Sequence, residues 1–439
     1  MTFLQRTGRL AVLFALAAVA TGCALYNDVT ISQLTLGPGD IDRGSDVPQM
    51  IRKNDYLRAI ELASSIDARS RKSAVELAAL GDVFLASGRY DLARRYLRAA
   101  LDLQPRRDAY ADIAWSLSQV EYMQNNYGPS LEWANVAIEH GMQIRRWHLD
   151  YIEALANTDV YHFPGTHSDS MPMRIGHPDV PRVDAKLNGR RTTGIIDSGA
   201  VLSIVSRELA DAIPIRRLGT FRGEFFGLLG EPISVEFGIV DRLELGDIVI
   251  ENVPVAIMPD EKMRFVVAGR KPFHMQFLLG ANLLKEFRLE LDFGRERATF
   301  TKLAARDRVS DPQQNLFIRG FRPHVRGSIN KRGWFLFILD TGSEVTFLND
   351  SHMRVVPLPV FGPKFHGATM QGLGGSTKTG AKVEDVQIGV DRWGGTFRTL
   401  PMYTSDDDLR VAGIVGENYL KHFRVVLDFG RMRLDLHRD

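Results

Sequence analysis

The chain has 439 residues, of which 44% are hydrophobic and 25% charged, and this composition is typical of a globular protein with two or three domains. Its 55 basic and 53 acidic residues are spread along the chain and leave a net charge of +2. Because nucleic-acid-binding proteins gather basic residues into a patch, no nucleic-acid partner is predicted.

The N-terminus has the charge order of a secretory signal. Arg6 and Arg9 precede an apolar run from Leu10 to Ala20, which is too short to span a bilayer as a stable helix. The run ends at Cys23 in "ATGC", a stretch that resembles the lipobox of bacterial lipoproteins. The resemblance implies that residues 1–22 are a signal peptide and that Cys23 is lipidated.

Cys23 is the only cysteine of the chain, so an exported protein carries its single thiol at the expected acylation position. Each buried methylene of an acyl chain contributes about 0.8 kcal/mol, and several chains would hold the protein on a membrane. We therefore expect a lipid-anchored protein of the cell envelope that faces the periplasm, with residues 23–49 as a tether. Ala24 favours the outer membrane. The alternative is ordinary signal cleavage nearby, with Cys23 incidental.

Residues 50–158 are predicted to form a helical domain. The stretch "LGDVFLASGRYDLARRYLRAALDLQP", residues 80–105, has small and aromatic residues at the spacings of a tetratricopeptide repeat, which it resembles. The flanking repeats are degenerate, so we expect the domain to lean on its neighbour or on residues 28–50. The resemblance implies either a concave face for a protein partner or a domain that only supports the next one, and both alternatives stay open.

Residues 159–182 carry four prolines without a clear period and are predicted to be a linker. Short apolar runs then alternate with turn residues, which favours β structure from residue 183 onward.

This β region contains an internal repeat. The stretch "TTGIIDSGAVLSIVS" places Asp197 after two isoleucines, and "FLFILDTGSEVTFLN" places Asp340 after Ile338 and Leu339, 143 residues later. A second pair of matching stretches begins at Leu278 and Ile414, and each reads apolar-apolar-glycine. The repeat predicts two lobes of like construction, residues 183–305 and 306–439.

Two Asp-Ser/Thr-Gly triplets at matching places of a duplicated β unit resemble the aspartic proteases of the retropepsin-like and pepsin-like kind. The resemblance covers roughly residues 183–439 and implies an all-β fold in which each lobe gives one such loop to a shared site. The short lobes favour a single-chain version of the retropepsin dimer. The implied activity is an aspartic endopeptidase that acts on peptide or protein substrates and needs neither a metal nor another cofactor.

Asp197 and Asp340 are the candidate catalytic residues. Two carboxyls brought together cannot both ionise, so they share a proton. One can then take a proton from water while the other gives one to the scissile carbonyl. Which of the two is the base stays open. The resemblance makes Ser198 and Thr341 braces between the loops, whereas Gly199 and Gly342 allow tight turns.

Two glycine-rich stretches lie between these landmarks and are predicted to form flaps that cover a bound peptide. The first contains Gly227 and Gly230, and the second contains Gly372 and Gly375. Ser203 and Thr346 are interpreted as hydrogen-bonding residues of the strands that follow the triplets. The histidines of the linker do not have the spacing of a zinc site.

Two alternatives to a single-chain endopeptidase remain open. The first is a non-catalytic lipoprotein that uses the same fold to bind peptides or to serve as a scaffold. The second retains proteolysis but pairs lobes from two chains.

Overall fold

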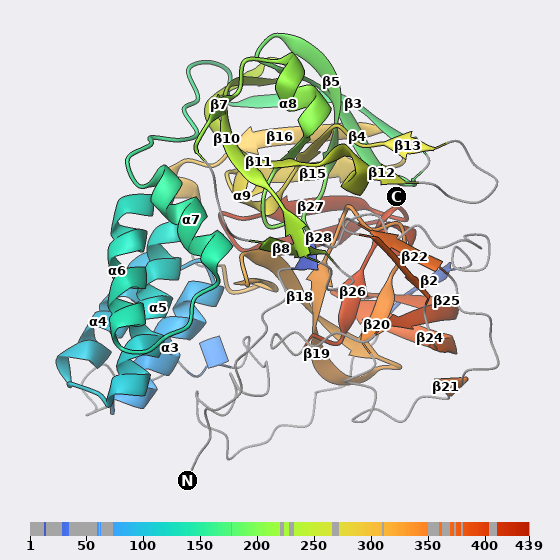
Figure 1. Ribbon diagram of the computed structural model, residues 1–439. Helices are drawn as coiled ribbons and strands as arrows, with labels where there is room; N and C mark the ends of the chain where they lie inside the picture. Colours follow the sequence, from blue (N-terminus) through green and yellow to red (C-terminus); the bar gives the residue numbers. More distant parts are fainter. Residues whose placement is uncertain are drawn as a thin grey trace.

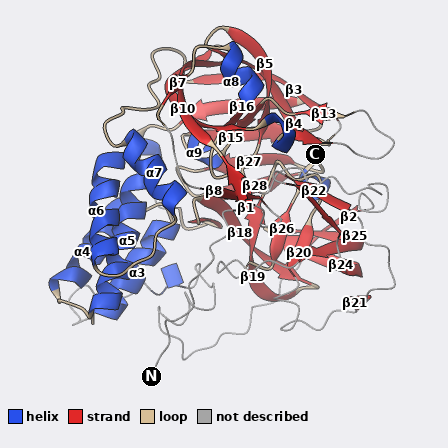
Figure 2. Ribbon diagram, in the orientation of Figure 1, coloured by secondary structure: helices blue, strands red, loops and turns tan. Residues whose placement is uncertain are grey.

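The computed structural model shows a helical block beside two β lobes (Figure 1). The long helices lie together on one side of the molecule, and only short helices lie among the strands, as Figure 2 shows. The predicted fold class, a helical region followed by two β lobes, is confirmed, whereas the tetratricopeptide assignment stays a prediction. The structure describes residues 13–14, 29–34, 59–60, 62, 73–176, 178–219, 224–227, 232–265, 272–309, 311–349, 360–361, 369–372, 375–378, 381–403 and 411–438.

Within residues 73–155, the helical block consists of two helix pairs and a further helix. The first of these helices is capped by Ser73, whose hydroxyl accepts the backbone N–H of Glu76 while the Glu76 carboxylate accepts that of Ser73, a reciprocal cap. Gly81 lets this helix approach the next one, because an added Cβ would overlap the Leu97 side chain. The helices are α3 (Ala74–Ala86), α4 (Tyr90–Asp102), α5 (Arg107–Met123), α6 (Tyr127–Glu139) and α7 (Arg146–Leu155).

Most strands of the first lobe belong to one sheet and alternate with short turns, as their period-two pattern predicts. Its elements are β3 (Ser168–Gly176), β4 (Val180–Leu187), β5 (Arg190–Ile196), β6 (Ile204–Ser206), α8 (Arg207–Ala212), β7 (Arg216–Arg217), β8 (Glu224–Gly227), β9 (Pro232–Ser234), β10 (Glu236–Leu245), β11 (Ile248–Met258), η2 (Asp260–Lys262), β12 (Arg264–Phe265), β13 (Phe273–His274), β14 (Phe277–Leu279), α9 (Ala281–Leu284), β15 (Phe287–Asp292) and β16 (Arg297–Lys302).

The second lobe repeats this order. Its elements are η3 (Ala305–Asp307), β17 (Leu316–Arg319), β18 (Arg322–Ile329), β19 (Arg332–Leu339), β20 (Phe347–Asn349), β21 (Val360–Phe361), β22 (Thr369–Gly372), β23 (Gly375–Lys378), β24 (Ala381–Val390), β25 (Trp393–Tyr403), β26 (Gly413–Val415), α11 (Glu417–Leu420), β27 (Arg424–Asp428) and β28 (Arg433–His437).

A sheet shared by the two lobes holds them together. β15 of the first lobe pairs antiparallel with β27 of the second, with Glu290 opposite Val426 at the middle of the ladder. β16 and β28 flank this central pair, and Figure 1 shows β27 lying next to the first lobe. The main-chain hydrogen bonds of this ladder fix the two lobes relative to each other.

The predicted linker, residues 159–182, is not free of strands. β3 pairs with β16 over Ser168–Pro172 and with β4 over Met173–Gly176. Pro172 lies where the strand changes partners. Proline within an apolar run normally argues against a strand because it lacks an N–H donor, and this hid β3 from the sequence reading.

The predicted tether, residues 23–49, also contains a strand. β2 (Val29–Gln33) pairs antiparallel with β25 of the second lobe, and the Ile31 side chain is buried there. β1 (Leu13–Phe14), within the predicted signal peptide, pairs in parallel with β8. Both strands add to sheet edges that are far away in the sequence, and such pairings have no local signature.

The helical block packs on both lobes, as expected for a block too short to bury its own core. In the second lobe, the turn between β17 and β18 inserts Phe321 between Tyr122 and His148, with ring centroids 4.5 and 4.9 Å apart. Close to the end of α3, the Ser87 carbonyl accepts the Gln314 side-chain amide at 3.4 Å.

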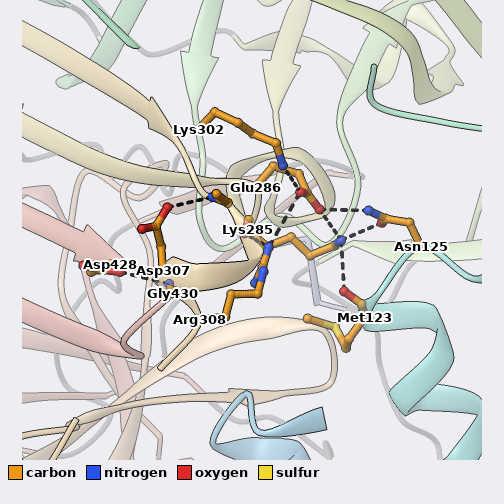
Figure 3. A network of polar contacts seen from close by, with 10 residues as sticks. Met123, Asn125, Lys285, Glu286, Lys302, Asp307, Arg308, Asp428 and Gly430 are labelled. Atoms are coloured by element: carbon orange, nitrogen blue, oxygen red, sulfur yellow. Dashed lines mark hydrogen bonds and ion pairs between the residues drawn. The ribbon is translucent and has the colours of Figure 1, made fainter. Parts of the chain in front are cut away.

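In the first lobe, a buried network of charged side chains forms hydrogen bonds with the turn between α5 and α6 (Figure 3). The Lys285 ammonium donates to the Met123 carbonyl at 3.2 Å, to Asn125 at 2.6 Å and to Glu286 at 2.8 Å. The Glu286 carboxylate also pairs with Lys302 at 2.7 Å. Although burial acts to raise it, the pKa of Glu286 is lowered by the surrounding cations, so the carboxylate stays ionised.

Candidate active site

The two repeated acids lie at the ends of equivalent strands. β14 runs parallel to β5, and the Leu279 carbonyl accepts the backbone N–H of Asp197 at 3.0 Å. β26 runs parallel to β19, and the Val415 carbonyl accepts the backbone N–H of Asp340 at 3.0 Å. Each apolar-apolar-glycine stretch thus forms the parallel strand next to an acid and hydrogen-bonds to the backbone of that acid.

Ser198 and Thr341 hydrogen-bond across the lobe interface in a reciprocal pattern. The Ser198 hydroxyl donates to the Leu339 carbonyl at 2.7 Å and accepts the N–H of Thr341 at 3.1 Å. The Thr341 hydroxyl donates to the Ile196 carbonyl at 2.8 Å and accepts the N–H of Ser198 at 3.0 Å. Four bonds therefore lock the two loops in one relative position.

This arrangement brings the two carboxyls together. Gly199 lies against the Asp340 carboxyl and Gly342 against the Asp197 carboxyl, so that a Cβ on either glycine would overlap the acid of the other lobe. The Asp197 carboxylate accepts the N–H of Ala200 at 2.8 Å, and that of Asp340 accepts the N–H of Gly342 at 2.9 Å. Each glycine thus makes room for the opposite acid.

Both carboxyls are fully buried, and this changes their ionisation. Burial raises the pKa of Asp197 well above its usual range, and the neighbouring Asp340 charge adds to the rise. Burial likewise raises the pKa of Asp340, to about 7, against the backbone hydrogen bond from Gly342. Since two like charges at this range disfavour each other, the pair holds at least one proton at neutral pH.

A comparison with known protein families matches part of the first lobe. Residues 183–283 match the family model described as aspartyl protease. The first lobe is similar to aspartyl proteases. A retropepsin-like aspartic protease from Rickettsia conorii aligns at 14% identity with 32% of this chain and 96% of its own, with a TM-score of 0.21. No curated protein sequence matches the chain.

Two asparagines that sequence reasoning missed support the loops that follow the two acids. The Asn282 side-chain oxygen accepts the Ser203 N–H at 2.7 Å and its hydroxyl at 3.0 Å. The Asn418 side-chain oxygen accepts both the N–H and the hydroxyl of Thr346 at 2.8 Å. Both asparagines follow the glycine of an aligned repeat stretch by two residues, and this shared position is the signal that could have found them.

Each hydroxyl residue also links its loop to the glycine of the apolar-apolar-glycine stretch. Ser203 accepts the Gly280 N–H and Thr346 accepts the Gly416 N–H, both at 3.1 Å. Their expected role as hydrogen-bonding residues therefore agrees with the structure.

The two flap candidates are antiparallel hairpins in the backbone. β8 pairs with β9 and ends at Gly227, whereas Gly230 lies outside the described residues. β22 pairs with β23, and Gly372 faces Gly375 at the end of that ladder. Whether they cover a substrate stays a prediction.

The predicted lipidation site, Cys23, lies outside the described residues. Within the part of the chain that the structure describes, no helix is long and apolar enough to cross a membrane.

Among the described residues, one group of side chains has the residue types of a metal site. Glu208, Asp260 and His274 bring ligand atoms within 4.8 Å of one another. These groups already form ion-pair contacts, however, since His274 lies 3.1 Å from Asp260 and Arg264 lies 3.4 Å from Glu208. The arrangement is that of a surface ion-pair group in the first lobe.

Proposed function

We propose that the protein is a membrane-anchored aspartic endopeptidase in which Asp197 and Asp340 together activate water. The observation that carries the proposal is the mutual approach of the two buried carboxyls from equivalent loops. A protein that only needed this fold for stability would have no use for two adjacent acids, because burying them costs stability.

The chemistry follows from one shared proton. The ionised carboxyl takes a proton from water while the water oxygen bonds to the scissile carbonyl carbon, and the protonated carboxyl gives its proton to the carbonyl oxygen. The resulting diol collapses as the carbon–nitrogen bond breaks. One diol hydroxyl gives its proton to the ionised carboxyl, and the amine leaves with the proton of the other carboxyl, so the pair again holds one proton. The step needs no metal and forms no covalent enzyme intermediate.

The test is cleavage of a peptide library by the purified protein and by its Asp197→Asn and Asp340→Asn variants. Each substitution removes one member of the acid–base pair, so each is expected to lower kcat/KM at least about a thousandfold. Near-ultraviolet circular dichroism checks that the variants are folded. Full activity in either variant would refute the shared mechanism.

The second candidate is a peptide-binding or scaffolding protein without catalysis. The parallel pairing of β1 with β8 favours some binding of extended chains at this hairpin. A statine-type transition-state analogue separates the two candidates. A working pair should bind it at least about a hundredfold more tightly than a matched uncleaved peptide, whereas a binding module should show no such preference.

Pairing of lobes from two chains is less well supported than a single-chain site. Both lobes of one chain already share the β15–β27 ladder and the reciprocal Ser198 and Thr341 bonds. Specific activity that stays constant on dilution into the nanomolar range would agree with the single-chain site, and its loss would favour two chains.

We further propose that lipidated Cys23 anchors the protein in the cell envelope with its lobes in the periplasm, at the outer membrane. β2 begins six residues after Cys23, and six extended residues span about 20 Å. The anchor would therefore hold the β25 edge of the second lobe near the membrane surface. Metabolic labelling with a fatty acid should mark the wild type and spare Cys23→Ala; labelling of both would refute acylation at this residue.

From the sequence alone, the helical block could either bind a protein partner or support the lobes. Its contacts with both lobes favour the supporting role. A protein partner on its repeats remains the other proposal for this block. Crosslinking in cells, followed by purification of the full chain, would report such a partner as a defined adduct on residues 74–155.

A further inference from the structure

The strand beside Asp340 carries a buried cation. In the antiparallel β18–β19 ladder His324 pairs with Ile338, and continuing this register places Arg322 opposite Asp340. Opposite residues of neighbouring strands project on the same face of a sheet. Arg322 is 1% exposed, so its charge lies in the protein interior on the side of this acid.

The equivalent position of the first lobe is apolar. In the β4–β5 ladder Arg182 pairs with Ile195, and the same continuation places Val180 opposite Asp197. Val180 is fully buried. Ser198 and Thr341 form equivalent hydrogen bonds between the two loops, but only Asp340 has a cation opposite it on the neighbouring strand.

Arg322 is also held in place by the helical block. It directly follows the two-residue turn of Gly320 and Phe321, and Phe321 is packed between Tyr122 and His148. The backbone that carries the guanidinium is therefore fixed on both sides, by the β18 ladder and by the helices.

We infer that Arg322 is a positioning residue that breaks the symmetry of the acid pair, so that Asp340 carries the negative charge and Asp197 carries the shared proton. The inference rests on the proposed function and adds the direction of proton transfer to it. A nearby positive charge favours the ionised form of a carboxyl, and the effect is larger in a buried site. Asp340 would then be the base toward water and Asp197 the acid toward the carbonyl oxygen.

The ionisation of the pair agrees with this assignment. Burial and the Gly342 N–H have the largest effects on the pKa of Asp340, and the Arg322 charge lowers this pKa.

Other titratable groups on the second lobe do not compete with Arg322. Burial lowers the pKa of His324 on the same strand, and Arg322 and Arg319 lower it further, so this imidazole is neutral. Glu417, at the start of α11, is fully buried, and burial raises its pKa well above the usual range. Among these groups, Arg322 is the one whose charge acts on Asp340.

A mixed group of charges lies between the lobes. Glu344, two residues after Gly342, accepts the backbone N–H of Asp179 at 2.5 Å. Burial lowers the pKa of Arg182, whereas the charges of Glu344 and Asp179 act to raise it. None of these three charges is among the main causes of the pKa shifts of Asp197 and Asp340.

The first test measures the titration midpoint of each acid separately and does not depend on catalytic activity. Aspartate labelled with ¹³C at the side-chain carboxyl is introduced into the full chain, and the remaining acid is titrated by NMR in Asp197→Asn and in Asp340→Asn, with the double variant for assignment. Asp340 alone should titrate at least about one pH unit below Asp197 alone. Equal midpoints or the reverse order would overturn the inference.

The second test removes the cation. Arg322→Met in the Asp197→Asn background should raise the midpoint of Asp340 by about one pH unit or more, and Arg322→Lys should restore most of the difference. Val180→Met is the matched control in the other lobe and should leave this midpoint unchanged. An Asp340 midpoint that does not move in a folded Arg322→Met variant would overturn the inference; if that variant does not fold, the first test decides with Arg322 in place.

The same variants in the active background separate this inference from the proposed function. The rising limb of kcat/KM against pH should shift upward in Arg322→Met and return in Arg322→Lys. If no substrate is cleaved but the carboxyls titrate in the stated order, the proposed function fails and the asymmetry stands. If the wild type cleaves peptides and Arg322→Met does not shift the rising limb of the kcat/KM–pH profile, only the inference about Arg322 fails.

Discussion

The two lobes are alike where they hold the acids and differ where they meet the rest of the molecule. Ser198 and Thr341 exchange equivalent bonds, and Asn282 and Asn418 brace equivalent hydroxyls. In contrast, only the second lobe gains the β2 strand. The duplicated residues position the pair of acids, whereas the unduplicated ones attach the lobes to the helices and to the N-terminal segment.

The residues that attach the first lobe to the helical block illustrate this difference, because they lie in a stretch that aligns with the second lobe. Lys285 and Glu286 follow α9 and form the buried network of Figure 3. The aligned residues after α11 are Lys421 and His422. The turn that contacts the helical block in the first lobe therefore has a different sequence in the second lobe.

The largest expected effect tests the symmetry of the acids. Gly199→Ala and Gly342→Ala each place a methyl group into the carboxyl of the opposite lobe, so each should lower kcat/KM by at least about a thousandfold by displacing one acid. Peptide cleavage measures the loss. A large effect in one lobe and none in the other would break the comparison.

The next effect tests the asymmetric attachment. Glu286→Gln leaves the buried Lys285 charge without its partner, and removal of one member of a buried ion pair costs about 3–5 kcal/mol. Urea unfolding measures the change. His422→Gln is the matched control at the aligned position and should cost under about 1 kcal/mol; equal losses would mean that the network is not what fastens the helices to the first lobe.

A third prediction concerns pH. The pKa of Asp340 is raised from its ordinary value to about 7, so the folded state binds more protons than the unfolded state between about pH 4 and 7. The free energy of unfolding should therefore fall as pH rises through this range, by about 2–4 kcal/mol, and Asp340→Asn should flatten the slope. Urea unfolding at several pH values measures it.

Leu243→Ala, which changes a buried apolar residue and leaves every titratable group in place, is the control for general effects of a buried substitution on this pH dependence. It should retain the slope between pH 4 and 7. An identical slope in the wild type and in Asp340→Asn would mean that the acid is not buried in the way the structure places it.

The smallest effect tests the support behind the loops. Ser203→Ala and Thr346→Val each leave a buried glycine N–H without its acceptor, and each should lower the free energy of unfolding by about 1–3 kcal/mol. Thermal unfolding measures both. Because the two sites have the same hydrogen bonds, the losses should agree within about 1 kcal/mol, and a larger gap would show that the supports are not equivalent.

Much of the candidate site could be predicted from the sequence because the duplication repeats a local pattern. Each copy of the repeat has an acid, a hydroxyl residue and a glycine directly after an apolar strand. Because the triplets occupy matching positions in the two copies, they can be distinguished from triplets that occur by chance. The asparagines occupied an aligned position and were available to the same reasoning. The strands of both flap candidates were expected as β structure, whereas Gly230 lies outside the described residues.

Other features had no local signature. β3 contains Pro172 and changes partners there, and β2 pairs with a strand more than 360 residues away. The contact of Lys285 with Met123 joins residues 162 positions apart. Each depends on which sheet edge or buried surface is left open after the rest of the chain has folded.

By itself, the sequence determined the two-lobed β region, the helical region before it and the identity of the paired acids, because periodicity and repetition are properties of short segments. Only the tertiary structure decided that a cation lies opposite Asp340 and an apolar residue opposite Asp197. Strand register sets which side chains face each other, and register is established by packing and hydrogen bonds between segments that are distant in the chain.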